Sequence, residues 1–322
     1  METRKELADY LGISIKAFTS ILYSKPRKAY YFPKTIKKSN GMDRQIYIVS
    51  EPLKFLQRQV ASKLSTNYTP SNFTYGFVQG KSIIKNAKYH QNKKYVIKLD
   101  LQDFFPSITF ARVRGMFMQY PFKFGKEAAT TLAQICCLDD ENGSIPQGAP
   151  SSPYIANMIC RKMDVQLARL AKKYKLHFTR YADDLTFSTN DNLPIETFLY
   201  EADFIIKASG FKLNNDKTRI MRRHQRQAVT GIIVNEGLNV NRKFLRNLRA
   251  TLHNCEKRNV YSQVVRNKFK DERNSRCKIW DVAGQWVDQY GDPIDVGPAK
   301  KRFLRFLRGK IAFYGQVVLD RK

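Results

Sequence analysis

The sequence is short of acidic residues. Its 322 residues include 57 Lys and Arg but only 28 Asp and Glu, which gives a formal net charge of +29. Because so large a positive charge repels itself unless a polyanion offsets it, nucleic acid is the first candidate partner. An anionic membrane is the other candidate, but the sequence contains no run of about 18 apolar residues, and the charged residues 1–10 are not a signal peptide. We therefore expect no membrane partner and a cytoplasmic location.

Cysteine is also scarce. The five cysteines are odd in number and none has the C-x-x-C spacing of a zinc clamp, so neither a disulfide framework nor a zinc ribbon is predicted. Cys136, Cys137 and Cys160 lie in apolar stretches and are expected to be small buried residues. With 43% hydrophobic and 12% aromatic residues, the chain has enough apolar material for a folded core.

No internal repeat and no low-complexity linker divides the chain, so its elements are read from local patterns. Residues 1–29 predict two short helices broken near Gly12, and residues 30–49 predict a basic β-hairpin. Further helices are predicted over residues 52–64, from Ser152 and Pro153 to residue 170, and over 244–252. Strands are predicted over residues 95–101 and, as a hairpin, over 178–189.

Three carboxylates stand out in this pattern. Asp100 ends an almost wholly apolar strand, and Asp183 with Asp184 occupies the tip of the predicted hairpin. Two acids at a turn are common and would usually be a solvated tip. If the two strands are neighbours in one sheet, however, the three side chains converge, and they suffice to hold two Mg²⁺ ions for in-line phosphoryl transfer.

Three segments around these acids resemble the palm motifs of reverse transcriptases, in the family's order. They are residues 99–107 (LDLQDFFPS), 146–153 (PQGAPSSP) and 181–184 (YADD). Residues 210–218 (GFKLNNDKT) resemble the palm motif that follows, and the segment from Lys34 to Arg44 resembles the family's fingers pattern. The resemblance spans residues 30–231. Five ordered patterns at family-like separations make coincidence negligible.

The resemblance implies an α+β right-hand polymerase with an antiparallel palm sheet and a helical thumb. On this basis residues 1–29 are an N-terminal helical segment, 30–94 the fingers, 95–235 the palm with interleaved fingers elements, and 236–322 a basic thumb that binds RNA. The implied activity is that of an RNA-directed DNA polymerase.

The resemblance also assigns roles at the metal site. Asp100, Asp183 and Asp184, with the Leu101 carbonyl as a further ligand, would hold two Mg²⁺ ions while a primer hydroxyl attacks the α-phosphate of a dNTP. Lys217 would protonate the leaving pyrophosphate, although a helix-cap or phosphate-contact role is the alternative.

Further residues would bind the incoming nucleotide. Lys34 and Arg44 would clamp its triphosphate, with Lys37 and Lys38 as competitors for the role of Lys34. Phe105 would exclude a ribose 2′-OH while its neighbour Phe104 packs in the core. The remaining two are Gln147, which would contact the nucleotide or template, and Gly148, which would permit a close backbone approach.

Two short elements resemble those of retron reverse transcriptases. Residues 86–90 match their Asn-Ala-x-x-His element through Asn86 and His90, and Val229, Thr230 and Gly231 match their Val-Thr-Gly element. A structural histidine and an ordinary strand end are the alternative interpretations. From the length we expect neither the maturase and DNA-binding regions of a group II intron protein nor a ribonuclease H-like domain.

A retron enzyme would copy a partner non-coding RNA, primed from a guanosine 2′-OH, into branched multicopy single-stranded DNA (msDNA). A host ribonuclease H would trim the template, and a separate effector protein would take part in anti-phage defence. The alternatives are an intron or abortive-infection reverse transcriptase, or a non-catalytic RNA-binding scaffold.

The last segment combines positive charge with aromatic residues. Arg302, Arg305, Arg308 and Lys310 alternate with phenylalanines, which predicts nucleic-acid contacts from a basic amphipathic helix. Residues 280–298, which hold both tryptophans and four acids, depart from this pattern, and the sequence suggests only an exposed loop or a partner-docking insert.

Overall fold

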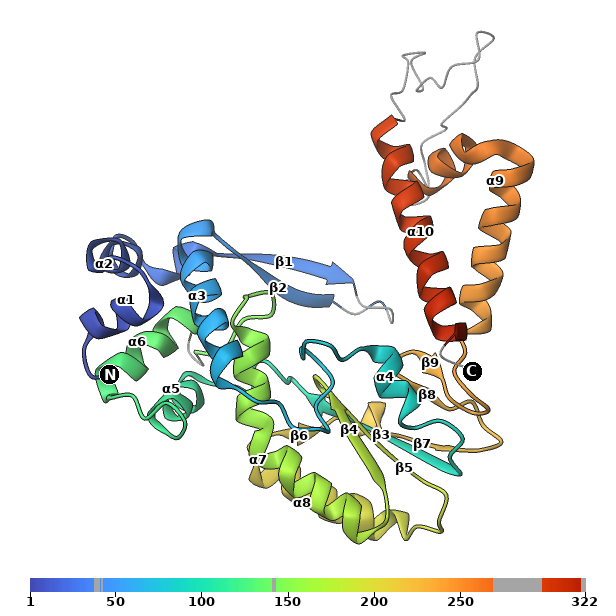
Figure 1. The fold of residues 1–322 in the computed structure, drawn as a ribbon, viewed down its shortest axis with the longest axis horizontal. Coiled ribbons are helices and arrows are strands. Elements are labelled where there is room, and N and C mark those ends of the chain that lie inside the picture. Colours follow the sequence, from blue (N-terminus) through green and yellow to red (C-terminus); the bar gives the residue numbers. More distant parts are fainter. Residues whose placement is uncertain (38–40, 42, 141–142, 269–296, 320–322) are drawn as a thin grey trace. The chain divides into compact units, whose positions relative to one another are not determined.

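The computed structural model describes residues 1–37, 41, 43–140, 143–268 and 297–319 (Figure 1). The chain divides between Thr230 and Gly231 into two compact units. The functional boundaries expected at residues 29/30, 94/95 and 235/236 remain predictions. Most of the unusual segment 280–298 lies outside the described residues.

The first unit begins with the two predicted helices. They are α1 (Arg4–Leu11) and α2 (Ile15–Tyr23), separated by Gly12 in the left-handed conformation with φ 72°. A short 3₁₀ helix, η1 (Arg27–Tyr30), leads into the antiparallel pair β1 (Tyr31–Lys37) and β2 (Asp43–Val49). Two helices follow, α3 (Glu51–Asn67) and α4 (Ile83–Lys88).

A five-stranded antiparallel sheet forms the centre of this unit. Its central strand β3 (Tyr95–Gln102) pairs on one side with β5 (Asp184–Thr189), which pairs in turn with β4 (His177–Tyr181). On its other side β3 pairs with β6 (Lys212–Leu213) and β7 (Arg219–Arg222). The remaining elements are α5 (Phe110–Met118), α6 (Lys126–Cys136), α7 (Ser152–Lys173), α8 (Ile195–Ala208), η2 (Asn215–Lys217) and β8 (Ala228–Val229).

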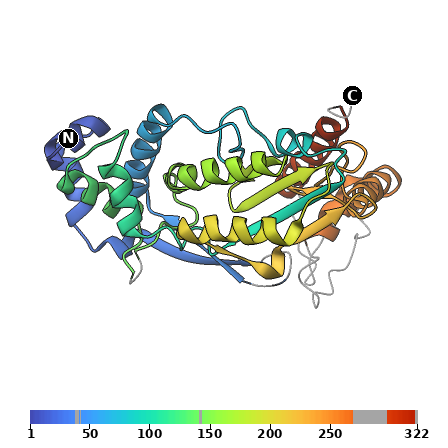
Figure 2. The same cartoon turned by 90° about the horizontal axis from the view of Figure 1, so that it is seen from below.

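The two faces of the sheet differ in chemistry because side chains alternate along each strand. In the β3–β5 register Ile97 lies opposite Phe187 and Leu99 opposite Leu185, and all four belong to the core beneath α7 and α8. Figure 2 shows these two helices running alongside the strands. The alternate positions, which include Lys98, Asp100 and Asp184, therefore share the opposite face.

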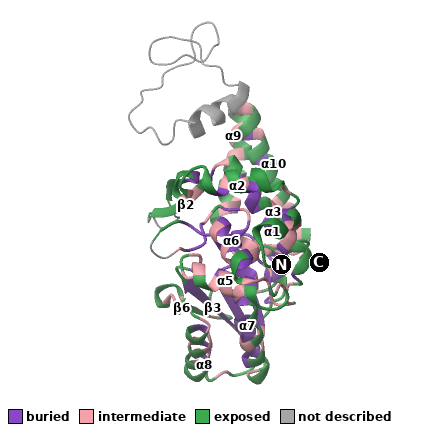
Figure 3. Ribbon diagram, turned by 90° about the vertical axis from the view of Figure 1, so that its left-hand side faces the viewer, coloured by how far each residue is buried: buried purple, intermediate pink, exposed green. Residues whose placement is uncertain are grey.

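Burial follows the same division. Buried residues, purple in Figure 3, concentrate along α7 and β3, whereas α8 turns exposed residues outward. The predicted burial of Cys136, Cys137 and Cys160 is confirmed, and all three are free thiols. None of the helices within the described ranges has both the length and the apolar character that a membrane span requires.

The second unit is built on a pair of helices. After the short strand β9 (Ile232–Ile233) come α9 (Arg242–Lys268) and α10 (Gly297–Leu319). Leu248 from α9 and Phe303 and Leu307 from α10 form a small core between them. The predicted helical spacings in this part of the sequence are therefore confirmed.

Candidate active site

Three carboxylates converge where β3 and β5 meet. Asp100 and Asp184 are direct partners in the antiparallel register, and the amide of Leu101 donates to the carbonyl oxygen of Asp183 at 3.0 Å. The hairpin predicted from the sequence therefore lies beside the predicted strand. Asp100 is buried, with 5% of its surface exposed, so its charge needs compensation from a nearby group.

Two lysines supply part of that compensation. Lys217 Nζ donates to Asp100 Oδ2 at 2.8 Å, and Lys98 Nζ lies 2.9 Å from Asp184 Oδ1. Within the described residues, the side chain of Asp183 has no ion-pair partner. The cluster therefore carries three carboxylates against two ammonium groups.

Burial and the close spacing of these charged groups shift the pKa values of Asp183, Asp184 and Lys217. Burial and the neighbouring charge of Asp184 raise the pKa of the Asp183 carboxyl above its ordinary value. Burial also raises the pKa of Asp184, although Lys98 partly opposes the rise. The hydrogen bond to Asp100 raises the pKa of Lys217, so this side chain stays an ammonium at neutral pH. An uncompensated anionic centre of this kind attracts cations.

The turn that carries Asp183 and Asp184 is held in place by a buried ion pair. Arg180 and Asp164 are fully buried and joined by two hydrogen bonds, from Nε to Oδ1 at 2.6 Å and from the guanidinium to Oδ2 at 2.8 Å. Arg180 also donates to the carbonyl oxygen of Ala182 at 3.1 Å, and Ala182 has the left-handed φ of 56°. A Cβ on Gly76 would lie 2.5 Å from the Ala182 nitrogen, so only glycine fits there.

The donor set fits Mg²⁺, because hard carboxylate oxygens are the ligands that this ion prefers. In the described part of the chain, however, no group of three or more His, Cys, Asp or Glu side chains is already arranged around a metal position. Lys98 and Lys217 occupy two of the carboxylates instead. The backbone of Leu101 pairs with Leu213 of β6, and its predicted role as a carbonyl ligand stays a prediction.

Phe105 lies in the turn that follows β3. Its ring is half-buried, 5.2 Å from the ring of Phe104 and 6.5 Å from that of Phe77. Phe104 itself is buried and stacks on Phe211, as its predicted packing role requires. Phe105 is therefore held by aromatic contacts while part of it stays accessible.

Gln147 and Gly148 contact the β1–β2 hairpin. The amide of Tyr47 in β2 donates to the carbonyl oxygen of Gln147 at 2.8 Å. Gly148 has φ 113°, and a Cβ there would lie 2.5 Å from the carbonyl oxygen of Tyr47. The close approach predicted for Gly148 is thus made to the protein's own backbone.

Lys34 and Arg44 lie on the same face of the β1–β2 hairpin. Lys34 is opposite Ile46, and Ile36 is opposite Arg44, so the alternation of side chains points all four to one side. Both basic residues are exposed. Of their predicted competitors, Lys37 is paired with Asp43 at 2.6 Å, and Lys38 lies outside the described residues.

Comparison with known proteins identifies the family. Residues 36–234 match the family described as reverse transcriptase (RNA-dependent DNA polymerase). The retron Ec86 reverse transcriptase of Escherichia coli is 31% identical over 257 residues, which cover 79% of this chain and 78% of that protein. The chain belongs to the retron reverse transcriptases. The predicted family and its right-hand polymerase fold are confirmed.

Other relatives agree. The retron Mx65 reverse transcriptase of Myxococcus xanthus is 36% identical over 268 residues, covering 78% of this chain and 62% of that protein. The retron Mx162 reverse transcriptase of the same organism is 33% identical, and 59% of it is covered. The chain thus spans about three fifths of these Myxococcus proteins. Among solved structures, a telomerase from Candida albicans is similar with a TM-score of 0.46 and 13% identity, over 70% of this chain and 49% of that one.

The two retron elements lie together in the fold. Thr230 Oγ1 donates to the carbonyl oxygen of Ile83 in α4 at 3.2 Å, although the two residues are 147 positions apart. Asn86 lies in α4, and His90 follows it. Thr230 and Gly231 have the positive φ values of 47° and 86°. The retron elements therefore form one structural feature.

Asn86, His90 and Val229 are completely buried, so their side chains do not reach the protein surface. The nucleic-acid contacts predicted for them stay predictions. His90 Nδ1 is 2.7 Å from Ser188 Oγ, and Nε2 is 2.7 Å from Thr179 Oγ1. These contacts fasten α4 to the palm sheet. Thr230 is partly exposed and Gly231 is exposed, and nucleic-acid binding by these two residues stays a prediction.

The four basic residues that the sequence predicted to bind nucleic acid lie on α10. Arg302, Arg305 and Arg308 are exposed, and Lys310 Nζ lies 4.2 Å from the ring centroid of Phe306, which is 58% exposed. Phe303 is buried, so it packs between the helices and cannot stack on a base. An exposed cationic and aromatic surface remains available for nucleic acid.

Sequence reasoning missed Lys98, Arg180 and Asp164. The signal for Lys98 is present, because it precedes Asp100 by two residues and must share its face of the strand. Arg180 is a charged residue inside an apolar strand just before the acidic turn, which should also have attracted notice. Its pairing with Asp164 depends on how α7 packs on the sheet, and no local pattern reveals it.

Proposed function

We propose that this chain is the RNA-directed DNA polymerase of a retron. The observation that carries the proposal is the convergence of Asp100, Asp183 and Asp184 beside Lys217, in a member of the retron reverse transcriptases. The raised pKa values of Asp183 and Asp184 support it, since perturbed carboxyl groups that cluster in this way are typical of functional sites.

The three carboxylates and the Leu101 carbonyl would hold two Mg²⁺ ions. When bound, such ions lower the barrier to attack of a hydroxyl on a phosphate and neutralise the charge that develops. Lys217 would hold a proton close to the leaving pyrophosphate. Asp100 would lose its bond to Lys217 when the site fills, which frees the ammonium for that task.

The nucleotide-binding residues come from two directions. Lys34 and Arg44 would bind the triphosphate from the hairpin, while Gln147 and Gly148 would contact the nucleotide or template from the loop packed against Tyr47. Phe105 would lie beneath the sugar, where a 2′-OH would not fit. This arrangement favours dNTPs over ribonucleotides.

Primer extension tests the catalytic part of the proposal. We expect the purified chain to extend oligo(dT) on poly(rA) with dTTP and Mg²⁺, and the Asp183→Asn and Asp184→Asn variants to lose this activity. Asp191→Asn is the matched control, because Asp191 is an exposed acid in the loop after β5. If the wild type binds RNA but extends no primer, the chain is a non-catalytic scaffold.

The retron part of the proposal concerns the partners. The template and primer would be a partner non-coding RNA with a priming guanosine 2′-OH, and the product would be branched msDNA. A host ribonuclease H would trim the template in the cytoplasm, and a separate effector would link the complex to anti-phage defence. The grouping of the two retron elements supports this assignment.

Nucleic acid that copurifies with the chain tests this part. Ribonuclease treatment should leave a discrete short DNA attached to a branched RNA residue. Active enzyme that carries heterogeneous RNA and no attached DNA would point instead to an intron or abortive-infection type of reverse transcriptase.

A further inference from the structure

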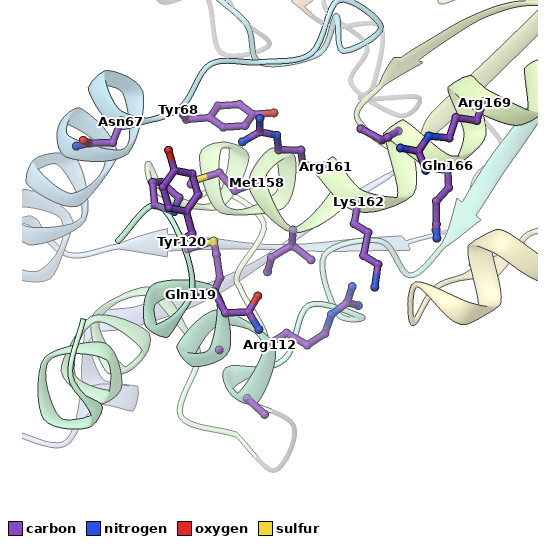
Figure 4. Close-up of a pocket in the computed structure, with 16 residues that line it drawn as sticks. Asn67, Tyr68, Arg112, Gln119, Tyr120, Met158, Arg161, Lys162, Gln166 and Arg169 are labelled. Atoms are coloured by element: carbon purple, nitrogen blue, oxygen red, sulfur yellow. The ribbon is translucent and has the colours of Figure 1, made fainter. Parts of the chain in front are cut away.

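A large groove lies on the side of α7 that faces away from the palm sheet. It has a volume of about 890 Å³, and its walls are the end of α3, residues 111–121 including most of α5, and residues 158–169 of α7 (Figure 4). On α7 itself, Asp164 is buried against Arg180 of the sheet, while Arg161, Val165 and Arg169 are exposed to the groove. None of the three catalytic carboxylates lines it.

The groove is positively charged. Four basic residues line it and no acidic residue does: Arg112, Arg161, Lys162 and Arg169. Arg112 is occupied by the carbonyl oxygens of Ser107, Ser209 and Gly210. The other three make no ion pair with any residue that the structure describes. Three cations without an ion-pair partner in one groove attract anionic ligands.

The groove also offers surfaces for bases. Tyr120, which Figure 4 places at one wall, is 80% exposed. Met158 and Ile159 add apolar surface. The side-chain amides of Gln119 and Gln166 carry no hydrogen bond to the described residues, so they are free to read polar edges. Unpaired RNA bases are recognised by aromatic stacking combined with such polar contacts.

We propose that this groove binds a short unpaired segment of the partner RNA, separate from the template strand in the active site. Its volume falls within the range of about 300–1,000 Å³ that is usual for small-ligand pockets, which suits one or a few nucleotides. An acidic protein helix is the competing ligand. However, the cations on α7 alternate with its apolar residues. This alternation suits a nucleic-acid strand, in which phosphates alternate with bases, better than it suits the continuous apolar stripe of an amphipathic helix.

Gly115 provides a way to test the groove without disturbing the core. It lines the groove from α5, and a Cβ added there meets no atom within 4 Å. A phenylalanine at this position would therefore place its ring in the groove and occupy part of it. Gly115→Ala is the matched control, because it makes the same backbone change and leaves most of the space open.

The experiment uses the full chain saturated with a poly(rA)–oligo(dT) template–primer and measures binding of a short fluorescent single-stranded RNA. Gly115→Phe should weaken the binding relative to Gly115→Ala, because the ring occupies part of the groove. Arg161→Glu combined with Arg169→Glu should weaken it about tenfold or more at moderate salt. Lys16→Glu with Lys28→Glu changes the net charge equally outside the groove and should have a much smaller effect.

Crosslinking locates the contact. A 4-thiouridine in the same RNA should crosslink to Tyr120 but not to Tyr200, which is equally open at 77% exposure and lies on α8 outside the groove. Unchanged RNA binding in Gly115→Phe would overturn the inference. So would equal binding of duplex RNA, or a poly-glutamate peptide that binds in the groove while single-stranded RNA does not.

The inference rests on the proposed function for the identity of the RNA, and the two can fail separately. The same preparations are assayed for primer extension, which the groove variants should retain. Loss of extension in the wild type would overturn the polymerase proposal alone. If primer extension is complete and Gly115→Phe does not change the RNA binding, only the groove proposal is overturned.

Discussion

Lys98 Nζ lies 2.9 Å from Oδ1 of Asp184, on the same face of the sheet as Asp100. The ammonium opposes the rise in the pKa of Asp184 that burial causes. Lys98 therefore belongs to the electrostatics of the catalytic cluster, although it lies outside the family motifs identified in the sequence.

Replacing Lys98 with Met should make the acidic cluster harder to ionise. The pKa of Asp184 should rise, so the acidic limb of the profile of kcat/KM against pH should move to higher pH. Primer extension across a range of pH measures this shift. Lys94→Met is the control, because Lys94 is exposed and bonds Asn192 rather than the acids. An unmoved limb would contradict the prediction.

Asp183→Asn should inactivate the enzyme and also stabilise it. The raised pKa of Asp183 means that its contribution to stability is present at low pH and is lost as pH rises through the folded-state value. Removing the charge should therefore raise the melting temperature at neutral pH, by about 2 °C or less for each ~1 kcal/mol in a chain of this length.

Thermal melts with and without Mg²⁺ check this prediction. The advantage of Asp183→Asn should shrink as pH falls, and added Mg²⁺ should raise the melting temperature of the wild type more than that of the variant. A variant that is less stable than the wild type at neutral pH would refute the account.

Substitutions in the Arg180–Asp164 pair should affect stability and turnover differently. Arg180→Met leaves a buried carboxylate without its partner and should cost about 3–5 kcal/mol in unfolding free energy. Adding Asp164→Leu should restore much of that stability, since no buried charge remains. Turnover should stay low in the double variant, because the Ala182 carbonyl has still lost its donor.

Urea unfolding and steady-state kinetics test this pair together. We expect a fall in kcat with little change in the KM for dNTP. Phe198→Leu, a core substitution beneath β5, provides an enzyme that is destabilised without a change at the turn. Recovery of kcat along with stability in the double variant would show that the pair has no positioning role.

His90 should make the fold sensitive to acid. Burial lowers its pKa to about 3, from an ordinary value near 6.5. The unfolded chain therefore binds a proton before the folded one, and stability is lost as pH falls below about 6.5, by at most about 1.4 kcal/mol per pH unit. His90→Gln should be less stable than the wild type at neutral pH, and the difference should narrow on acidification. Urea midpoints at several pH values measure it, and a constant difference would contradict the assignment.

Local pattern predicted most of the elements, because alternation and helical spacing were strong. The strand before Asp100, the hairpin around Asp183 and Asp184, and the long helix after the Gln147 loop all appear in the structure. The sequence predicts Ser152 as the N-cap of that helix, with Pro153 in its first turn, whereas in the structure Ser151 is the N-cap and Ser152 is the first helical residue. Ser152 instead bonds the carbonyl oxygen of Pro146 at 2.7 Å.

The environment of each motif residue could not be predicted in the same way. The pattern around His90 gives its spacing from Asn86, but its burial depends on the hydroxyl groups of Thr179 and Ser188, about ninety and a hundred residues away. The close neighbour of Gly148 in the structure is the Tyr47 carbonyl oxygen, which no local pattern indicates, and its predicted role at the nucleotide stays a prediction. Tertiary packing decides which motif residues reach solvent.

The contact between Tyr47 and the Gln147 loop has a mechanical consequence. A backbone hydrogen bond and the tight approach at Gly148 tie the hairpin to the loop. If the hairpin rotates, we therefore expect the loop to move with it. The triphosphate contacts of Lys34 and Arg44 and the base contacts of Gln147 would then form and break together. Nucleotide capture would then be a single cooperative event.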